Sequence, residues 1–321
     1  MAREEARPDP VRYACGRGSP LRVLEAPGFG LRAAEQRRVA LWRQIVGELT
    51  TPHYAALVAL RAEPGLDHIR VADRIAADKA TMTEVTRFLC ARDLVETTSD
   101  PRDGRRRVLS LLPAGEAALE RVAPLVRGVD DLLLAPLDTA ARTEVVDLWT
   151  RVADSDQREW PWAMAGEGTR SLPAEVRTSL THSGFVLRRA RQQHARLWER
   201  LVGPDVTPAQ YALLDVLHHD EPLTPGVLAR RASVEETTAV RVLRRLAERG
   251  ELLRAPDPRD ARRVLLRLTD SGRALLLEHT TAVNEVQSTL VRPLSPPEAG
   301  RLARLSAQVA GLVTADGTPL A

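Results

Sequence analysis

The chain has 321 residues, which suggests about two domains, and its 44% apolar and 28% charged content is ordinary for a globular protein. No apolar run approaches the ~20 residues needed to cross a bilayer, and no apolar segment follows the charged N-terminus, so we expect a cytoplasmic protein without membrane contact. A formal net charge of +3 excludes a polycation, and the Arg-rich, Lys-poor composition is typical of a GC-rich bacterial genome.

The first part of the chain predicts an arm followed by helices. Residues 1–27 are rich in Arg, Pro and Gly and lack periodicity, so we expect a flexible arm. Apolar spacing predicts a helix over about 31–47. A second helix starts at Thr51-Pro52, because Thr is a good N-cap and Pro suits the first helical position.

A helix-turn-helix is predicted next, followed by a hairpin. Two short helices, at about 69–76 and 79–92, are separated by a break, which is the pattern of a helix-turn-helix. Two strand-like runs, 94–98 and 107–111, then flank a Pro- and Gly-containing turn, which predicts a hairpin. Longer helices over about 113–133 and 139–152 complete the series.

The whole series then recurs. Asp100-Pro101-Arg102-Asp103-Gly104-Arg105-Arg106 returns 157 positions later as Asp257-Pro258-Arg259-Asp260-Ala261-Arg262-Arg263. A repeat of this length means a duplicated domain, since solenoids have much shorter periods. We therefore predict a domain at 28–154, a linker rich in Pro and Gly at 155–178, and a second domain at 179–315.

The order of elements resembles that of the MarR family of winged helix-turn-helix transcription regulators. The motif Asp-x-Arg-Asp-x-Arg is followed in the second copy by Leu268-Thr269-Asp270-Ser271-Gly272, and in the first by the degenerate 111–115. The resemblance implies a mainly α fold with small β-hairpin wings, in which two winged helix-turn-helix domains form an intramolecular pseudo-dimer. Ordinary members are homodimers, so this chain is either a monomer acting as a pseudo-dimer or a homodimer of the fusion.

The partner implied by the resemblance is double-stranded operator DNA, read by the second helix of each helix-turn-helix in the major groove. The expected reading residues of the first copy are Lys79, Ala80, Thr83, Glu84 and Arg87, and those of the second are Glu236, Thr237, Val240, Arg241 and Arg244. The two faces differ at four of these five positions, and Arg87 corresponds to Arg244. We therefore predict an operator with imperfect or absent palindromy.

The wings are expected to supply arginines to the minor groove. In the family, the Asp-x-Arg portion of the loop presents an Arg that the Asp braces, which carries over to Asp103 with Arg105 and to Asp260 with Arg262. Arg106 and Arg263 are further candidates. The alternative is an Asp–Arg pair that stabilises the turn without touching DNA.

A small aromatic or phenolic effector is also implied, because many relatives bind one between the dimerisation helices and the DNA-reading lobe. The candidate lining consists of Trp42 and Trp198 with His53 and Gln210, and Arg38 and His194 are placed to meet a carboxylate or phenolate. Core packing of the Trp residues is the alternative. No cofactor is expected, and the scattered His residues lack zinc-like spacing.

The predicted function is a sequence-specific DNA-binding transcription regulator, most often a repressor in such families. An enzyme is not expected, since the sequence has no Gly-rich phosphate loop and no nucleophile elbow. The alternative is an interaction or architectural protein with one degraded reading head and no ligand response. Residues 70–116 have nine Arg and Lys against eight acidic residues, whereas residues 226–273 have twelve Arg against seven.

Overall fold

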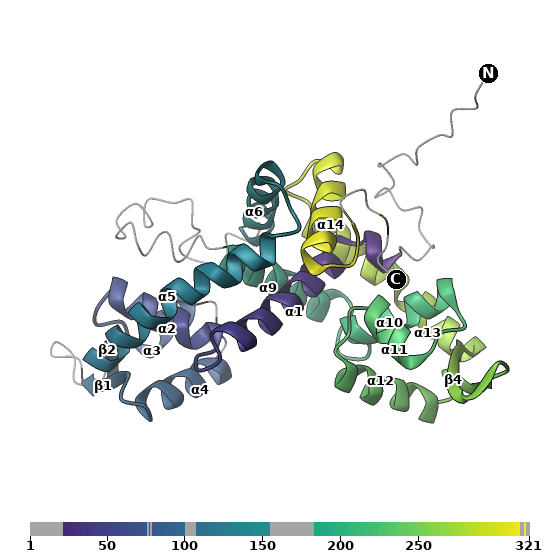
Figure 1. Cartoon of the computed structure of the whole chain (residues 1–321), viewed down its shortest axis with the longest axis horizontal. Coiled ribbons are helices and arrows are strands. Elements are labelled where there is room, and N and C mark those ends of the chain that lie inside the picture. The colour runs from purple at the N-terminus through teal and green to yellow at the C-terminus, as the bar shows by residue number, and fades with distance from the viewer. Residues whose placement is uncertain are drawn as a thin grey trace, which may run out of the picture. The chain divides into compact units, whose positions relative to one another are not determined.

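The computed structural model describes residues 22–75, 77, 79–99, 107–154, 183–314 and 318, which are mostly helical (Figure 1). The first group of elements is η1 (Val23–Glu25), α1 (Pro27–Ile45), α2 (Thr51–Ala62), α3 (His68–Arg74), α4 (Lys79–Cys90), β1 (Val95–Ser99), β2 (Arg107–Leu111), α5 (Pro113–Leu134) and α6 (Thr139–Ala153). The second group is α9 (Ser183–Leu201), α10 (Pro208–Asp220), α11 (Pro225–Arg231), α12 (Glu236–Glu248), β3 (Leu252–Asp257), β4 (Asp260–Leu268), α13 (Asp270–Leu290) and α14 (Pro296–Ala310). None of these helices is both long enough and apolar enough to span a membrane.

The α-helices of the second group repeat the first group position by position. α9 starts 156 positions after α1, and α10 to α14 each start 157 positions after α2 to α6. Each group also holds one antiparallel hairpin, β1 with β2 and β3 with β4. The mainly helical class with small hairpins is therefore confirmed. The turn of the first hairpin, residues 100–106, lies outside the described residues.

The described residues form two compact units, and each unit takes segments from both repeats. Unit 1 falls within residues 1–35, 136–155 and 190–321, and unit 2 within 36–135 and 156–189. Each unit therefore contains one helix-turn-helix and one hairpin, together with the first turns of the long helix that begins the other repeat. The boundaries 28–154 and 179–315 describe the sequence repeat and stay a prediction, and the linker 155–178 lies outside the described residues.

Local sequence explains how each helix-turn-helix is held. In unit 2, Thr50 and His53 form a capping box at the start of α2, and the Asp67 side chain accepts a hydrogen bond from the amide of Arg70 to cap α3. In unit 1, the Thr207 hydroxyl caps α10 in the same way, 3.2 Å from the amide of Gln210. These caps fix the residues at which α2, α3 and α10 start.

The beginning of the described chain packs onto unit 1, although the sequence predicts a flexible arm over 1–27. Val23 is buried, and its amide donates a hydrogen bond of 2.9 Å to Oδ2 of Asp215 on α10. The partner lies 192 positions away, so no local pattern could reveal this contact. Residues 1–21 lie outside the described part of the chain.

Asp215 makes the stability of unit 1 depend on pH. Burial raises its pKa to about 6 from an ordinary 3.8, although the amide of Val23 and the neighbouring His219 oppose the shift. Between these values the folded chain holds a proton that the unfolded chain releases, so this group's contribution to stability falls as pH rises.

Asp215→Asn keeps an acceptor for Val23 but does not titrate. The difference between the free energy of unfolding of the Asp215→Asn variant and that of the unsubstituted chain should increase from about pH 4 to about pH 7 in urea titrations. A constant or decreasing difference would contradict the assignment.

Candidate nucleic-acid interface

The outer face of α12 carries five exposed side chains. The helix turns Ala239, Leu243 and Leu246 into the core of unit 1. Its opposite face exposes the residues predicted to read DNA, namely Glu236, Thr237, Val240, Arg241 and Arg244. Val240 is 59% exposed, which is unusual for an apolar residue on a helix that has a well-formed core face. An exposed valine next to arginines suits contact with a thymine methyl group beside a guanine.

The outer face of α4 has the same geometry but different chemistry. Met82, Val85 and Leu89 point into the core of unit 2. Lys79, Ala80, Thr83, Glu84 and Arg87 are all exposed. Arg87 lies 3.4 Å from the carboxylate of Glu84, and the Thr83 hydroxyl donates to the carbonyl oxygen of Lys79. The Arg87 guanidinium and the Thr83 hydroxyl, two hydrogen-bond donors of this face, thus contact other groups of α4.

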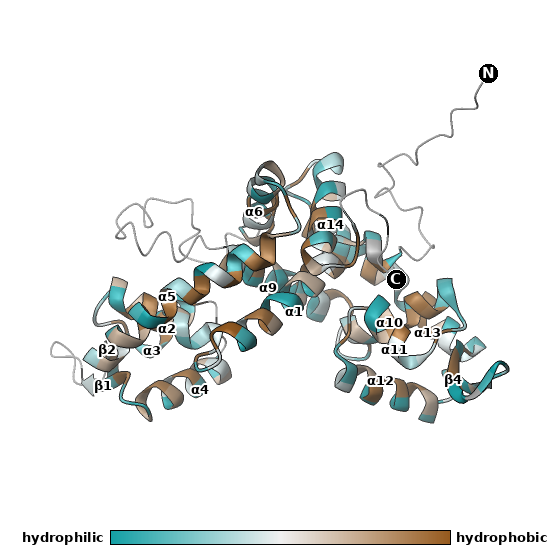
Figure 2. Cartoon of the chain, viewed as in Figure 1, coloured by the Kyte–Doolittle hydropathy of each residue, from teal (hydrophilic) through white to brown (hydrophobic). Residues whose placement is uncertain are grey.

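The hairpin of unit 1 presents arginines at its tip, which Figure 2 colours as hydrophilic. The carboxylate of Asp260 accepts hydrogen bonds from the amide and from Nε of Arg262, at 3.1 and 3.2 Å. Arg263 lies 3.5 Å from the other oxygen of Asp260. The Arg262 side chain is nevertheless 92% exposed, so the carboxylate orients the guanidinium without covering it. In the first wing, Asp103, Arg105 and Arg106 lie outside the described residues.

Unit 2 contains a cavity of about 430 Å³, part of which opens to solvent. Trp42, Tyr54 and Phe185 supply aromatic walls, and Arg38 and Asp130 supply charge. Arg38 is 2% exposed and donates a hydrogen bond to the Thr51 hydroxyl at 2.9 Å. A guanidinium at an aromatic cavity can bind a carboxylate or phenolate.

Unit 1 contains the counterpart cavity, with about 370 Å³ of empty space, part of which opens to solvent. Trp198, Tyr211 and Phe29 stand where unit 2 has Trp42, Tyr54 and Phe185, but His194 replaces Arg38 and Gln287 replaces Asp130. Burial, with the nearby Arg191 and Arg32, lowers the pKa of His194 to about 3, so its ring is neutral near pH 7. Its Nε2 has no hydrogen-bond partner among the described residues. The two cavities therefore have corresponding aromatic walls but differ in charge.

The chain is similar in sequence to known transcription regulators. The sequence model of the MarR family matches residues 205–263, from α10 through the second wing. The HTH-type transcriptional repressor NicR of Pseudomonas putida is 30% identical over 141 residues, which are 43% of this chain and 89% of that protein. The transcriptional regulator HosA of Escherichia coli O111:H- is 33% identical over 107 residues, 33% of this chain and 79% of that one.

The chain belongs to the MarR family of winged-helix transcription regulators.

Among solved structures, the PcaV transcriptional regulator of Streptomyces coelicolor in complex with its natural ligand is 39% identical and covers 38% of this chain and 88% of that chain. The TM-score between the two structures is 0.37.

Two residues predicted to line the effector site have other contacts in this MarR-family chain. His53 accepts a hydrogen bond from the amide of Thr50 and stacks on Phe88, with ring centroids 3.8 Å apart. Burial is the main reason that its pKa falls to about 4. Gln210 lies in the first turn of α10, where its amide is capped by Thr207. The described linings of the two cavities include neither residue, whereas Trp42, Arg38, Trp198 and His194 are all present.

The cavity walls also include residues that sequence reasoning missed. Phe29 and Arg32 complete the cavity of unit 1, and Gly184 and Phe185 complete that of unit 2. These residues start the long helix of the opposite repeat. Phe29 and Phe185 occupy equivalent positions of the two repeats, which is the sequence signal that relates these cavity walls. The structure shows that Phe29 enters unit 1 and Phe185 enters unit 2.

Arg32 links a cavity to a recognition helix. Its buried guanidinium donates hydrogen bonds of 2.6 Å to the carbonyl oxygens of Ala232 and Ser233, in the turn between α11 and α12. In unit 2, the corresponding Arg188 donates to the carbonyl oxygen of Ile75, at the end of α3. Each helix-turn-helix of this MarR-family chain is therefore tied to an arginine from the other repeat. Among the described residues, no group of three or more potential metal ligands occurs.

Proposed function

We propose that this chain is a DNA-binding repressor with two non-identical reading heads, which together act as an intramolecular pseudo-dimer. Support comes first from the outer faces of α4 and α12. Both faces are exposed at corresponding positions, and they differ at four of the five, since only Arg87 and Arg244 are the same residue. Helices of this kind place their N-terminal residues at base edges in the major groove.

The charge of each head sets its share of the binding. Residues 226–273 have twelve Arg against seven acidic residues, whereas residues 70–116 have nine Arg and Lys against eight. The α12 face has two arginines, Arg241 and Arg244, of which Arg244 lies 3.5 Å from Glu248, and Arg87 of α4 lies 3.4 Å from Glu84. Arginine binds guanine through two hydrogen bonds, and glutamate repels phosphate or accepts from cytosine. The head of unit 1 should therefore contribute more of both the phosphate attraction and the base discrimination.

Selection of binding sites from a random DNA pool tests the two-headed reading. We expect an operator whose halves differ in sequence, because the reading faces differ at four of their five positions. The stronger consensus should belong to the half that Arg241→Ala relaxes, at a cost of about 1–3 kcal/mol. Two identical inverted half-sites would contradict the proposal.

A second candidate function is favoured by the small charge excess of the first copy, where residues 70–116 have nine Arg and Lys against eight acidic residues. Under this alternative, the head of unit 2 is degraded and the chain acts as an interaction or architectural protein. Arg87→Ala separates the two, since it leaves the α12 face intact. Loss of affinity and of discrimination in one half-site supports two working heads, whereas unchanged binding supports the alternative.

We further propose that a small aromatic or phenolic ligand enters the cavities and releases the chain from DNA. Arg32 supports this coupling, because one side chain both lines the cavity of unit 1 and holds the turn before α12. A ligand that displaces the guanidinium from the carbonyl oxygens of Ala232 and Ser233 frees that turn. A ligand shifts the equilibrium only by its differential affinity for the two arrangements.

The two cavities should differ in the ligands they accept. Arg38 can bind an aromatic carboxylate through charge-assisted hydrogen bonds, while the neutral His194 favours an uncharged phenol whose hydroxyl donates to Nε2. In calorimetric titrations with benzoate, we expect Arg38→Met to weaken binding about tenfold or more, since a hydrogen bond to a charged group contributes roughly 1.5–3 kcal/mol. His194→Leu is the matched control at the corresponding position and should leave this benzoate site unchanged. Equal losses in both variants, or no loss in Arg38→Met, would contradict the assignment.

A further inference from the structure

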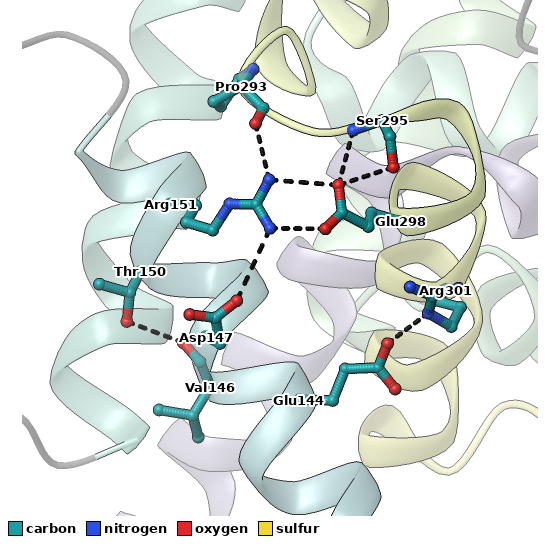
Figure 3. Close-up of polar contacts among 9 residues, drawn as sticks. All are labelled: Glu144, Val146, Asp147, Thr150, Arg151, Pro293, Ser295, Glu298 and Arg301. Atoms are coloured by element: carbon teal, nitrogen blue, oxygen red, sulfur yellow. Dashed lines mark hydrogen bonds and ion pairs between the residues drawn. The ribbon is translucent and has the colours of Figure 1, made fainter.

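Helices α6 and α14 lie against each other in unit 1, and each is the repeat counterpart of the other (Figures 1 and 3). Both contain 15 residues, and both start after a capping residue, Asp138 or Ser295, which are 157 positions apart. Position by position, one helix is therefore the duplicate of the helix it packs against.

The contacts between them join corresponding positions. Glu144 pairs with Nε of Arg301, and these residues are 157 positions apart. The indole of Trp149 donates a hydrogen bond of 3.0 Å to the hydroxyl of Ser306, again 157 positions away. A local two-fold axis between two helices brings such equivalent positions face to face.

At each of these positions the two repeats have diverged into complementary residues. If α6 packed in the same way against a second α6, Glu144 would face another glutamate and Trp149 another tryptophan. If α14 packed against a second α14, Arg301 would face arginine, and two serines would stand where Trp149 now fills the core. Like charges repel, and the pair of tryptophans would overpack a site in which Trp149 and Ser306 are both fully buried.

A third contact is one-sided. The guanidinium of Arg151 binds both oxygens of Glu298, at 2.7 and 3.2 Å, and also donates to the carbonyl oxygen of Pro293 (Figure 3). The Glu298 carboxylate is held in place by the amide and hydroxyl of Ser295. The repeat counterpart of Arg151 is Gln308 and that of Glu298 is Ala141, so the symmetric copy of this pair does not exist.

We propose that α6 and α14 have become a mutually specific pair, in which each helix accepts the other repeat of this chain and rejects a second copy of itself. This inference deepens the proposed pseudo-dimer. It makes the asymmetry of the chain a property of its assembly as well as of its DNA-reading faces. Opposite charges at equivalent positions and a large residue facing a small one are the devices by which paired helices select their partners.

A charge-reversal cycle on the full chain tests the specificity of the pair. Glu144→Arg places like charges at the contact, and so does Arg301→Glu. We expect each to lower Tm by about 2–4 °C, and the double variant to return within about 1 °C of the unsubstituted chain. The matched controls are Thr143→Arg and Arg304→Glu, which alter exposed neighbours on the same two helices. Additive losses in the double variant, or equal losses in the controls, would overturn the proposal.

Cross-linking measures the choice of partner directly. In a chain with Cys15→Ser and Cys90→Ser, Glu144→Cys with Arg301→Cys should give a product of one chain when treated with a short bis-maleimide. Glu144→Cys alone should give no covalent dimer, because equivalent positions of two α6 helices never meet. A covalent dimer from that single variant would overturn the proposal. Neither readout involves DNA, so a failure of the proposed function would leave both results interpretable.

Discussion

Replacing Arg262 with alanine is expected to weaken operator binding by about 1–3 kcal/mol, or roughly 5- to 150-fold in Kd. Asp260 orients this side chain while leaving it 92% exposed, which is the arrangement a minor-groove contact requires. A narrow, A·T-rich minor groove attracts arginine through its enhanced negative potential. Titration of labelled operator at fixed salt measures the effect.

Arg292→Ala is the control for this substitution, because it removes an exposed arginine at the far end of α13 from the hairpin. We expect it to leave Kd nearly unchanged. If Arg262→Ala and Arg292→Ala have equal effects, the guanidinium contributes general charge. If Arg262→Ala has no effect, the Asp260–Arg262 pair stabilises the turn and does not contact DNA.

Replacing Trp149 with alanine is expected to lower the free energy of unfolding by about 3–5 kcal/mol. Trp149 is fully buried between α6 and α14, and its indole hydrogen-bonds to Ser306, which is also fully buried. The substitution removes apolar area from the core and leaves the hydroxyl of Ser306 without this partner.

Urea unfolding followed by circular dichroism measures this loss. Trp149→Phe serves as the graded control, since it keeps a six-membered aromatic ring but loses the indole N–H donor. We expect it to lower the free energy of unfolding by about a third as much as Trp149→Ala. A loss below ~1 kcal/mol for the alanine variant would mean that the pairing of α6 with α14 contributes little to the fold.

The sequence predicts the elements of this fold well, because each depends on local signals. Thr207-Pro208 starts α10, and the break after residue 75 separates α3 from α4. The reading faces also follow from helical spacing, since residues three and four apart share a side. Met82 of α4 and Ala239 of α12 are buried on the opposite, core-facing sides of these helices, and Phe88 and Val242 are half-buried.

Contacts between distant segments could not be predicted in this way. Arg32 reaches the carbonyl oxygens of Ala232 and Ser233, about two hundred positions away in the chain. The carboxylate of Asp215 accepts a hydrogen bond from the amide of Val23. The repeat identifies which residues are equivalent, but not which unit the first turns of α1 and α9 enter. Each cavity therefore contains two of the predicted residues, Trp42 with Arg38 or Trp198 with His194, together with walls from the opposite repeat.

The measurement that tests the account most directly is hydroxyl-radical footprinting of one chain on its selected operator. We expect two protected tracts about one helical turn apart, with one chain bound per duplex. Arg241→Ala with Arg244→Ala should weaken one tract and leave the other protected at saturating protein. A single tract, or two tracts that disappear together at saturation, would contradict two independent reading heads.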